Sequence, residues 1–208
     1  MTIWLASGNK HKQQELSAIL NGHTVKIPAE AGISGFNPEE TGTSFIENAL
    51  IKAKALYSRL SVPVLADDSG LCVDALEGRP GIYSSRYYGK TGISAKLSDG
   101  ERNLLLLEEL GNTALRKCRF ICAMVLLFSP NRFYLVQETM EGEIVSSAEE
   151  IRGSGGFGYD PIVYSPELGR TVAELFEEEK NRLSHRGKAG KAIAGFLQAA
   201  MDVTIDKR

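Results

Sequence analysis

The chain has 208 residues, of which 43% are hydrophobic and 24% are charged, and its formal net charge is -2. A soluble chain of this size buries a substantial core, so we expect a single domain over residues 1–208. The near-neutral charge argues against a nucleic-acid polymer or an anionic membrane as partner, and the short apolar runs and unremarkable N-terminus predict a cytoplasmic protein.

Helices and strands alternate in the first third of the chain. The expected elements are strands at 2–6, 24–27 and 62–66 and helices at 12–20 and 44–60. Ser44 and Glu47 form a capping box at the start of the second helix. The third strand is expected to end on two adjacent acids, Asp67 and Asp68.

A hairpin is expected in the middle of the chain, where two apolar strands flank Pro130-Asn131. Cys72, Cys118 and Cys122 match neither a zinc nor a disulfide spacing, which favours reduced, buried thiols. The other expected elements are a strand continuing over 71–76, a helix at 98–111, hairpin strands at 116–129 and 132–140, a glycine-rich loop at 152–160, a strand at 161–164 and a helix at 184–201. A hairpin among interleaved helices predicts a mixed sheet.

The stretch SGNKHK lies where the first strand turns into the first helix. Backbone N–H groups and the positive end of a helix dipole bind anions there, and the cationic side chains suit a triphosphate. The candidate residues are Ser7, Gly8, Asn9, Lys10, His11 and Lys12. The stretch lacks the second glycine and the Lys-Ser/Thr pair of a Walker A loop, so a solvated turn with surface lysines is an equal alternative.

The adjacent acids Asp67 and Asp68 repel each other and need compensation. Mg²⁺ binds one or two carboxylates together with water and phosphate oxygens, and Glu40 is a further candidate ligand if its loop folds back. A carboxylate near such a metal can orient or deprotonate an attacking water. The alternative is a turn capped by the acids together with Ser69 and Gly70.

The stretch GGFGYDP (155–161) combines glycines, which permit close backbone approach, with an aromatic residue, Phe157. Stacking of a base on such a ring contributes about 1–3 kcal/mol. Asp160 follows at the entrance to a strand. The alternative is a glycine turn with Phe157 and Tyr159 packed in the core.

Lys180, His185 and Arg186 lie near the expected start of the last helix. Donors grouped in this way suit the recognition of a carbonyl oxygen on a base. A pocket that donates at this position rejects an amino group, because its donors are then left unpaired. A solvated cationic helix start is the alternative.

Five stretches in this order together closely resemble the inosine triphosphate pyrophosphatase family. They are SGNKHK, EETGTSFIENALIKA, the stretch from LADDSGL to PGIYSSRY, GGFGYDPI and EEKNRLSHRGKA, and the resemblance covers roughly residues 3 to 200. The resemblance implies an α/β fold with a mixed β-sheet in two lobes, flanking helices and a central active-site cleft. It further implies an Mg²⁺-dependent, homodimeric pyrophosphatase that attacks the α-phosphorus of ITP, dITP or XTP.

The resemblance also implies roles for single residues. Asp68 is the implied general base and, with Glu40, the implied metal ligand, while Phe157 stacks on the base. The implied substrate contacts are Ser7, Gly8, Asn9, Lys10, His11, Lys12, Lys52, Ser69, Phe157, Gly158, Tyr159, Asp160, Lys180, His185 and Arg186. Many members have threonine where this chain has Ser7, which keeps the hydroxyl.

Two other functions remain as alternatives. A nucleotide-binding sensor without turnover would keep the glycine loops but has no need of the acids Glu40, Asp67 and Asp68. A hydrolase of the standard nucleotides, or a phosphomonoesterase, on the same scaffold would have no need of His185 and Arg186.

Overall fold

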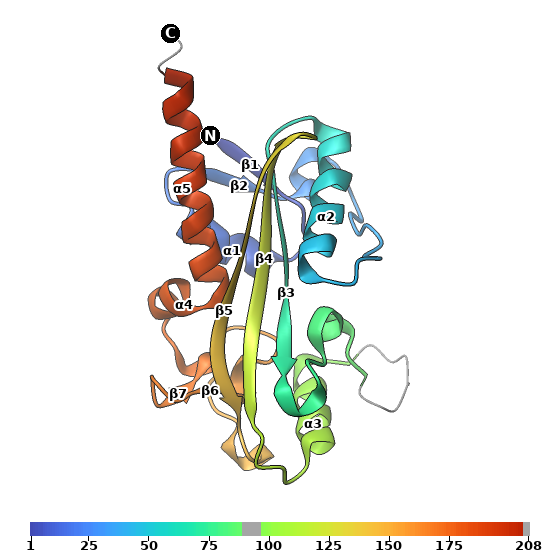
Figure 1. Cartoon of the computed structure of the whole chain (residues 1–208), viewed down its shortest axis with the longest axis vertical. Coiled ribbons are helices and arrows are strands. Elements are labelled where there is room, and N and C mark those ends of the chain that lie inside the picture. The colour runs from blue at the N-terminus through green and yellow to red at the C-terminus, as the bar shows by residue number, and fades with distance from the viewer. Residues whose placement is uncertain (89–96, 206–208) are drawn as a thin grey trace. The chain divides into compact units, whose positions relative to one another are not determined.

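The computed structural model describes residues 1–88 and 97–205, and its strands form one mixed sheet of order β2-β1-β3-β4-β5-β6-β7 (Figure 1). The strands are β1 (Thr2–Leu5), β2 (Thr24–Lys26), β3 (Val64–Val73), β4 (Lys117–Ser129), β5 (Arg132–Ile144), β6 (Val163–Ser165) and β7 (Arg170–Thr171). Both neighbours of β1 run parallel to it, whereas β5, β6 and β7 pair antiparallel, so the predicted mixed sheet is confirmed.

Five α-helices flank this sheet in the described part of the chain. They are α1 (Lys10–Ile19), α2 (Phe45–Leu60), α3 (Asp99–Leu110), α4 (Glu177–Leu183) and α5 (His185–Ile205). Within the same residues, no helix is both long and apolar enough to cross a membrane.

The chain folds as two compact units. Unit 1 consists of Met1–Asp68, Cys122–Glu138 and the residues from Leu183 onward, and unit 2 of Ser69–Ile121 and Thr139–Arg182. Three long strands, β3, β4 and β5, contribute residues to both units. The single domain over 1–208 remains a prediction.

Unit 1 packs helices on both faces of its strands. Figure 1 shows α1 and α5 on one side of β3 and α2 on the other. The core on the first side joins Leu16 of α1, Leu65 of β3 and Ile193 of α5, all fully buried. Because side chains alternate across a strand, Asp67 shares the face of Leu65 and Asp68 points to the opposite face.

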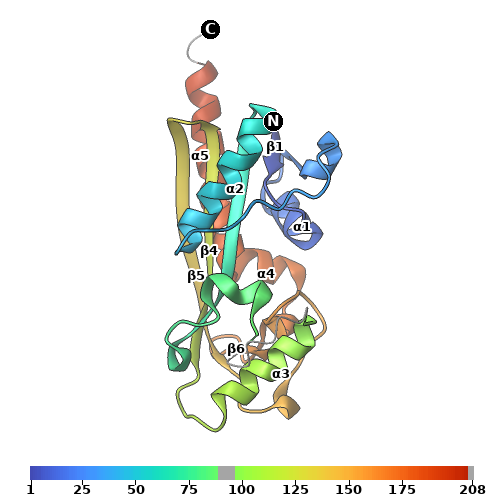
Figure 2. The same ribbon diagram turned by 90° about the vertical axis from the view of Figure 1, so that its right-hand side faces the viewer.

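Unit 2 has its own apolar core, to which α3 contributes Leu106, Leu107 and Leu110. The course of α3 can be followed in Figure 2. Ser98 and Glu101 close a capping box at the start of this helix, because each side chain bonds to the other residue's backbone N–H. Leu71 and Val163, from β3 and β6, belong to the same core.

The most important departure from the sequence prediction is at the two acids. The strand does not end there, because β3 runs on to Val73 before a 3-10 turn at Asp74–Leu76. Asp67 and Asp68 therefore lie inside a buried strand, and the alternative of a turn capped by the acids with Ser69 and Gly70 is wrong. A charge in this position needs partners, since burial of an unpaired carboxylate is costly.

Other boundaries shift for local reasons. The first helix begins at Lys10 instead of residue 12 because Asn9 caps it, and β5 continues to Ile144. The strand expected at 161–164 is β6, which starts only after a 3-10 turn at Asp160–Ile162. The short α4 and β7 were not predicted.

Candidate active site

The two adjacent acids of β3 find separate partners on the two faces of the strand. Asp67 accepts a hydrogen bond from Arg186 Nε at 3.0 Å and pairs with Lys12. Asp68 accepts a hydrogen bond from Lys52 Nζ at 2.6 Å. Strand alternation therefore resolves the repulsion expected from the sequence, because each carboxylate has its own cation.

Asp67 is fully buried and lies at the centre of a network of charged and polar side chains. Its Oδ2 also accepts from the thiol of Cys122 at 3.1 Å, and Arg186 Nη1 lies 2.7 Å from Glu15 Oε2. Burial alone would raise the pKa of Asp67, but the charges of Arg186 and Lys12 outweigh it and hold this pKa well below its usual range. Asp67 is therefore ionised at neutral pH and serves as a counter-ion.

Asp68 has the opposite electrostatic character. Burial raises its pKa, and the attraction of Lys52 compensates only in part. The Lys52 ammonium lies 2.9 Å from Glu40 Oε1 as well, so one cation serves two carboxylates. A carboxylate that readily takes up a proton, next to a fixed cation, has the properties of a general base.

The loop that carries Glu40 is fastened along the first turns of α2. Asn48 Oδ1 accepts the Gly42 N–H at 2.9 Å, and Glu47 Oε2 accepts the Thr43 N–H at 2.6 Å. A Cβ on Gly42 would lie 2.6 Å from the Glu47 Cβ, so only glycine permits this approach. Asn48 is fully buried and was missed in the sequence, although it lies in the apolar stripe of its helix.

The predicted phosphate loop forms the expected turn between β1 and α1. Asn9 is the N-cap, and its side chain accepts the N–H groups of His11 at 2.9 Å and Lys12 at 3.3 Å. Ser7 Oγ accepts the Asn9 N–H at 3.1 Å. Lys10 and His11 are exposed, whereas Lys12 turns inward to Asp67. The cationic character predicted for this turn is therefore divided between the surface and the interior.

We call the charged groups around β3 the acid cluster. It consists of Glu15, Glu40, Asp67 and Asp68 with Lys12, Lys52 and Arg186. Its four carboxylates exceed its three cations, and Asp68 Oδ2 is buried without a hydrogen bond in the described structure. The described residues contain no group of three or more His, Cys, Asp or Glu side chains placed to hold a metal. Mg²⁺ needs only one or two carboxylates, so Glu40 and Asp68 fit this ion.

Unit 2 brings together three of the residues predicted to recognise a base. Asp160 Oδ2 accepts the Phe157 N–H at 2.9 Å and the Lys180 ammonium at 2.8 Å. The same ammonium lies 5.0 Å from the centroid of the Phe157 ring. A Cβ on Gly156 would overlap the Asp160 carboxylate, so a larger residue there would disrupt the group.

The remaining predicted residues have structural partners. The Tyr159 side chain is buried, and its hydroxyl donates to the Ser84 carbonyl at 3.0 Å, which agrees with the core alternative for this residue. Ser69 is half-buried in β3. His185 is buried at the start of α5, one residue after Ser184.

The sequence of this chain is similar to the sequences of known proteins. The model of the Ham1 family matches residues 3–196. The chain belongs to the Ham1 family. It is 50% identical over 200 residues to the dITP/XTP pyrophosphatase of Treponema denticola, covering 96% of this chain and 100% of that protein. The corresponding protein of Thermus thermophilus is 43% identical over 197 residues, which cover 93% and 90% of the two chains.

The fold agrees with that of Ham1 proteins of known structure. The Staphylococcus aureus Ham1 protein superposes with a TM-score of 0.82 at 38% identity, over 96% of this chain and 100% of that one. The Coxiella burnetii HAM1 protein gives the same TM-score and identity, over 96% and 99% of the two chains. The family prediction made from the sequence motifs is thus confirmed.

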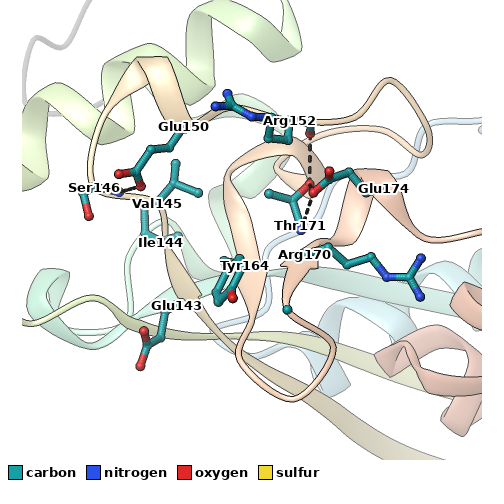
Figure 3. A pocket seen from close by; sticks show the side chains of 11 residues that line it. Glu143, Ile144, Val145, Ser146, Glu150, Arg152, Tyr164, Arg170, Thr171 and Glu174 are labelled. Atoms are coloured by element: carbon teal, nitrogen blue, oxygen red, sulfur yellow. Dashed lines mark hydrogen bonds between the residues drawn. The ribbon is translucent and has the colours of Figure 1, made fainter.

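A separate pocket in unit 2 of this Ham1-family chain is lined by other residues (Figure 3). Thr171 donates its N–H to Glu174 at 2.8 Å and its hydroxyl to the Arg152 carbonyl at 3.0 Å. Glu150 accepts the Ser146 N–H on another part of the wall. None of the residues predicted from the motifs lines this pocket, so the predicted chemistry does not depend on it.

Proposed function

We propose that the chain hydrolyses noncanonical purine nucleoside triphosphates, namely ITP, dITP and XTP, to the monophosphate and pyrophosphate. The observation that carries the proposal is the group of Glu40, Lys52 and Asp68, in which a buried carboxylate with a raised pKa lies against a cation. Relatives at 42–50% identity that are named dITP/XTP pyrophosphatases support this choice of substrates. Removal of such nucleotides from the pool is the corresponding role.

Asp68 is the proposed general base. It takes a proton from a water molecule as the water oxygen bonds to the α-phosphorus. The bond from this phosphorus to the oxygen that bridges it to the β-phosphorus breaks, and the electron pair leaves with pyrophosphate. The charges of Lys52 and Lys12 favour the negative charge that develops on the phosphate oxygens. Ser7, Gly8, Asn9, Lys10 and His11 complete the proposed phosphate contacts.

Glu40 and Asp68 are the residues proposed to hold Mg²⁺. When bound, the ion supplies charge neutralisation and polarisation of the phosphate oxygens. The excess of carboxylates in the acid cluster supports this assignment, since a cation balances it. The backbone anchors of the Glu40 loop, Gly42 and Thr43, keep the first of these ligands in place.

Phe157 is proposed to stack on the purine, with Gly158, Tyr159, Asp160 and Lys180 around it and Ser69 as a further contact. His185 and Arg186 are proposed to favour a 6-keto group. Arg186 uses Nε and Nη1 to contact Asp67 and Glu15, and a guanidinium has further donors, so its contact with a base depends on those. A homodimer in the cytoplasm completes the proposal.

The test is a substrate panel with separate assays of pyrophosphate and orthophosphate. Purified protein is incubated with Mg²⁺ and equal concentrations of ITP, XTP, dITP, ATP and GTP. We expect pyrophosphate from the first three, and a loss of about 10²–10⁴-fold in kcat for Asp68→Asn. Asp74→Asn, which removes an exposed carboxylate paired with Arg119, is the matched control.

Each alternative has a distinct outcome in this panel. Binding of ITP without turnover would support the nucleotide sensor. Equal rates on all five nucleotides would contradict the roles of His185 and Arg186, and orthophosphate as the first product would contradict the cleaved bond.

A further inference from the structure

Helix α3 holds both polar backbone groups of Gly158, the residue that follows the stacking aromatic. Asp99 Oδ2 accepts the Gly158 N–H at 2.7 Å, and Asn103 Nδ2 donates to the Gly158 carbonyl at 3.2 Å. Asp99 and Asn103 are four residues apart, so they project from one face of the helix. Neither residue belongs to a stretch that carries the family resemblance.

The two residues that bind Gly158 differ in exposure, so their hydrogen bonds contribute differently to the stability of the loop. Asn103 is 3% exposed, and a buried amide is costly unless it is hydrogen-bonded. Asp99 is more exposed and also pairs with Arg102, which in turn donates to the Leu97 carbonyl at 2.6 Å. The buried amide of Asn103 thus holds the Gly158 carbonyl. The more exposed carboxylate of Asp99 holds the Gly158 N–H and adds to this restraint.

We call residues 156–160 the base loop, and each part of it is fastened from a different side. The Phe157 N–H is bound by Asp160, and the Tyr159 hydroxyl by the Ser84 carbonyl. Gly158 has a φ of +66°, a conformation that glycine adopts without strain. Glycine has a freer backbone than any other residue type, so fixing the peptide groups of Gly158 restricts the direction of the adjacent Phe157 ring.

We propose that Asp99 and Asn103 are positioning residues for the base, because they clamp Gly158 and thereby hold Phe157 in the orientation that stacks. This inference rests on the proposed function. It extends the binding machinery to a helix that contributes no residue to the predicted substrate contacts. Stacking tolerates any purine, so the clamp strengthens binding of every base and leaves discrimination among bases to other groups.

The first test is a double-mutant cycle on KM for ITP, measured by pyrophosphate release. Asn103→Leu removes the donor and keeps a similar volume. We expect KM to rise by about tenfold and kcat to change by less than about twofold, the pattern of a lost uniform binding interaction. XTP and dITP should show the same ratio, and Asn112→Leu, which replaces an exposed amide just beyond α3, should leave KM unchanged.

The cycle separates positioning from a general loss of structure. In a Phe157→Ala background, adding Asn103→Leu should change KM by less than about twofold, because the ring that the clamp positions is gone. An equal rise in KM in both backgrounds, or no rise in the single variant, would overturn the inference.

A second measurement does not require turnover. Hydrogen exchange at the Gly158 amide should be protected in the full chain and accelerate by about tenfold or more in Asp99→Ala, with unchanged exchange in the α5 helix. If the chain released no pyrophosphate from ITP, the proposed function would fail while this exchange result stood. Unchanged exchange at Gly158 in a variant that still hydrolyses ITP would refute the clamp alone.

Discussion

The acid cluster of unit 1 and the base loop of unit 2 are held by different kinds of interaction. In the acid cluster, side chains from distant parts of the chain pair by charge, as Asp67 does with Lys12 and Arg186. In the base loop, most contacts involve backbone groups, such as the N–H of Phe157 and both groups of Gly158. Charge pairing thus holds the side chains of the acid cluster, whereas backbone hydrogen bonds hold the base loop.

This difference has a chemical meaning. Buried ion pairs contribute little net stability, yet removal of one partner leaves a costly uncompensated charge. In the proposed reaction, the same pairs provide fixed charges for the phosphate oxygens that gain negative charge. A stacking surface needs a defined position and little charge, and glycines with backbone hydrogen bonds provide it.

The largest effect expected from this comparison contrasts a lysine of the acid cluster, Lys52, with the lysine of α4 that contacts the base loop, Lys180. Lys52→Met should lower kcat by about 10²–10³-fold, because it removes a charge that stabilises the transition state. Lys180→Met should mainly raise KM, because this ammonium lies over the Phe157 ring and against Asp160. Steady-state kinetics with ITP at several temperatures would give kcat and KM for each variant.

Both lysine variants leave a buried carboxylate behind, so both should lose stability. Measurement well below each melting temperature keeps this loss out of the kinetics. A fall in kcat for Lys180→Met as large as that for Lys52→Met would contradict the prediction that Lys52 mainly affects kcat and Lys180 mainly affects KM.

The next effect concerns stability and uses a matched pair of carboxylates. Asp67→Asn removes one of the two carboxylates that pair with the buried Arg186, Glu15 being the other, and should lower the free energy of unfolding by about 3–5 kcal/mol. Asp74→Asn breaks the exposed pair with Arg119 and should cost about 0–1 kcal/mol. Urea denaturation followed by the fluorescence of Trp4 would measure both, and equal losses would contradict the buried network.

The pH dependence of stability sharpens the same comparison. Because the pKa of Asp67 is lower in the folded chain than in the unfolded chain, its contribution is complete above the ordinary aspartate pKa of about 3.9. That contribution is lost as the pH falls below this value. Between about pH 5 and about pH 2, unfolding free energy should therefore fall more steeply in the parent chain than in Asp67→Asn. Parallel curves would refute the ionised state assigned to Asp67.

The smallest expected effect tests the backbone shape of the base loop. Gly156 has a φ of +72°, and an added Cβ would overlap the Asp160 carboxylate and lie 2.9 Å from Lys180 Nζ. Gly156→Ala should therefore cost about 1–3 kcal/mol and raise KM for ITP. Gly100→Ala in α3 meets open space and should instead stabilise the chain by about 0.5–1 kcal/mol. Thermal unfolding of the two variants would reveal the contrast.

Local patterns predicted much of the fold. The capping residue Ser44 gave the start of α2 correctly, and the two-residue turn at Pro130-Asn131 predicted the hairpin of β4 and β5. Both features depend on neighbours within a few residues, which a sequence displays directly. The hairpin among interleaved helices predicted the mixed sheet, and the family resemblance implied it as well.

Local sequence patterns could not predict the partners of Asp67 and Asp68. The run before Asp67 suggested a strand end, because a charge inside a buried strand needs partners, and Arg186 lies 119 residues away in the sequence. Asn48 and Asn103 were missed for a related reason, since an amide on a helix usually faces water. Their positions within apolar stripes offered a signal, because a buried amide requires a hydrogen-bond partner.

The thiols of β4 offer a way to follow each unit separately. Cys118 and Cys122 are both buried and four residues apart, yet the first belongs to unit 2 and the second to unit 1. Burial raises the pKa of Cys118 to about 12, and burial together with Asp67 raises that of Cys122 well above its usual value. Neither thiol therefore reacts with an alkylating reagent while its unit is closed. The relative labelling rates of the two, read by mass spectrometry, report how often each unit opens in the intact chain.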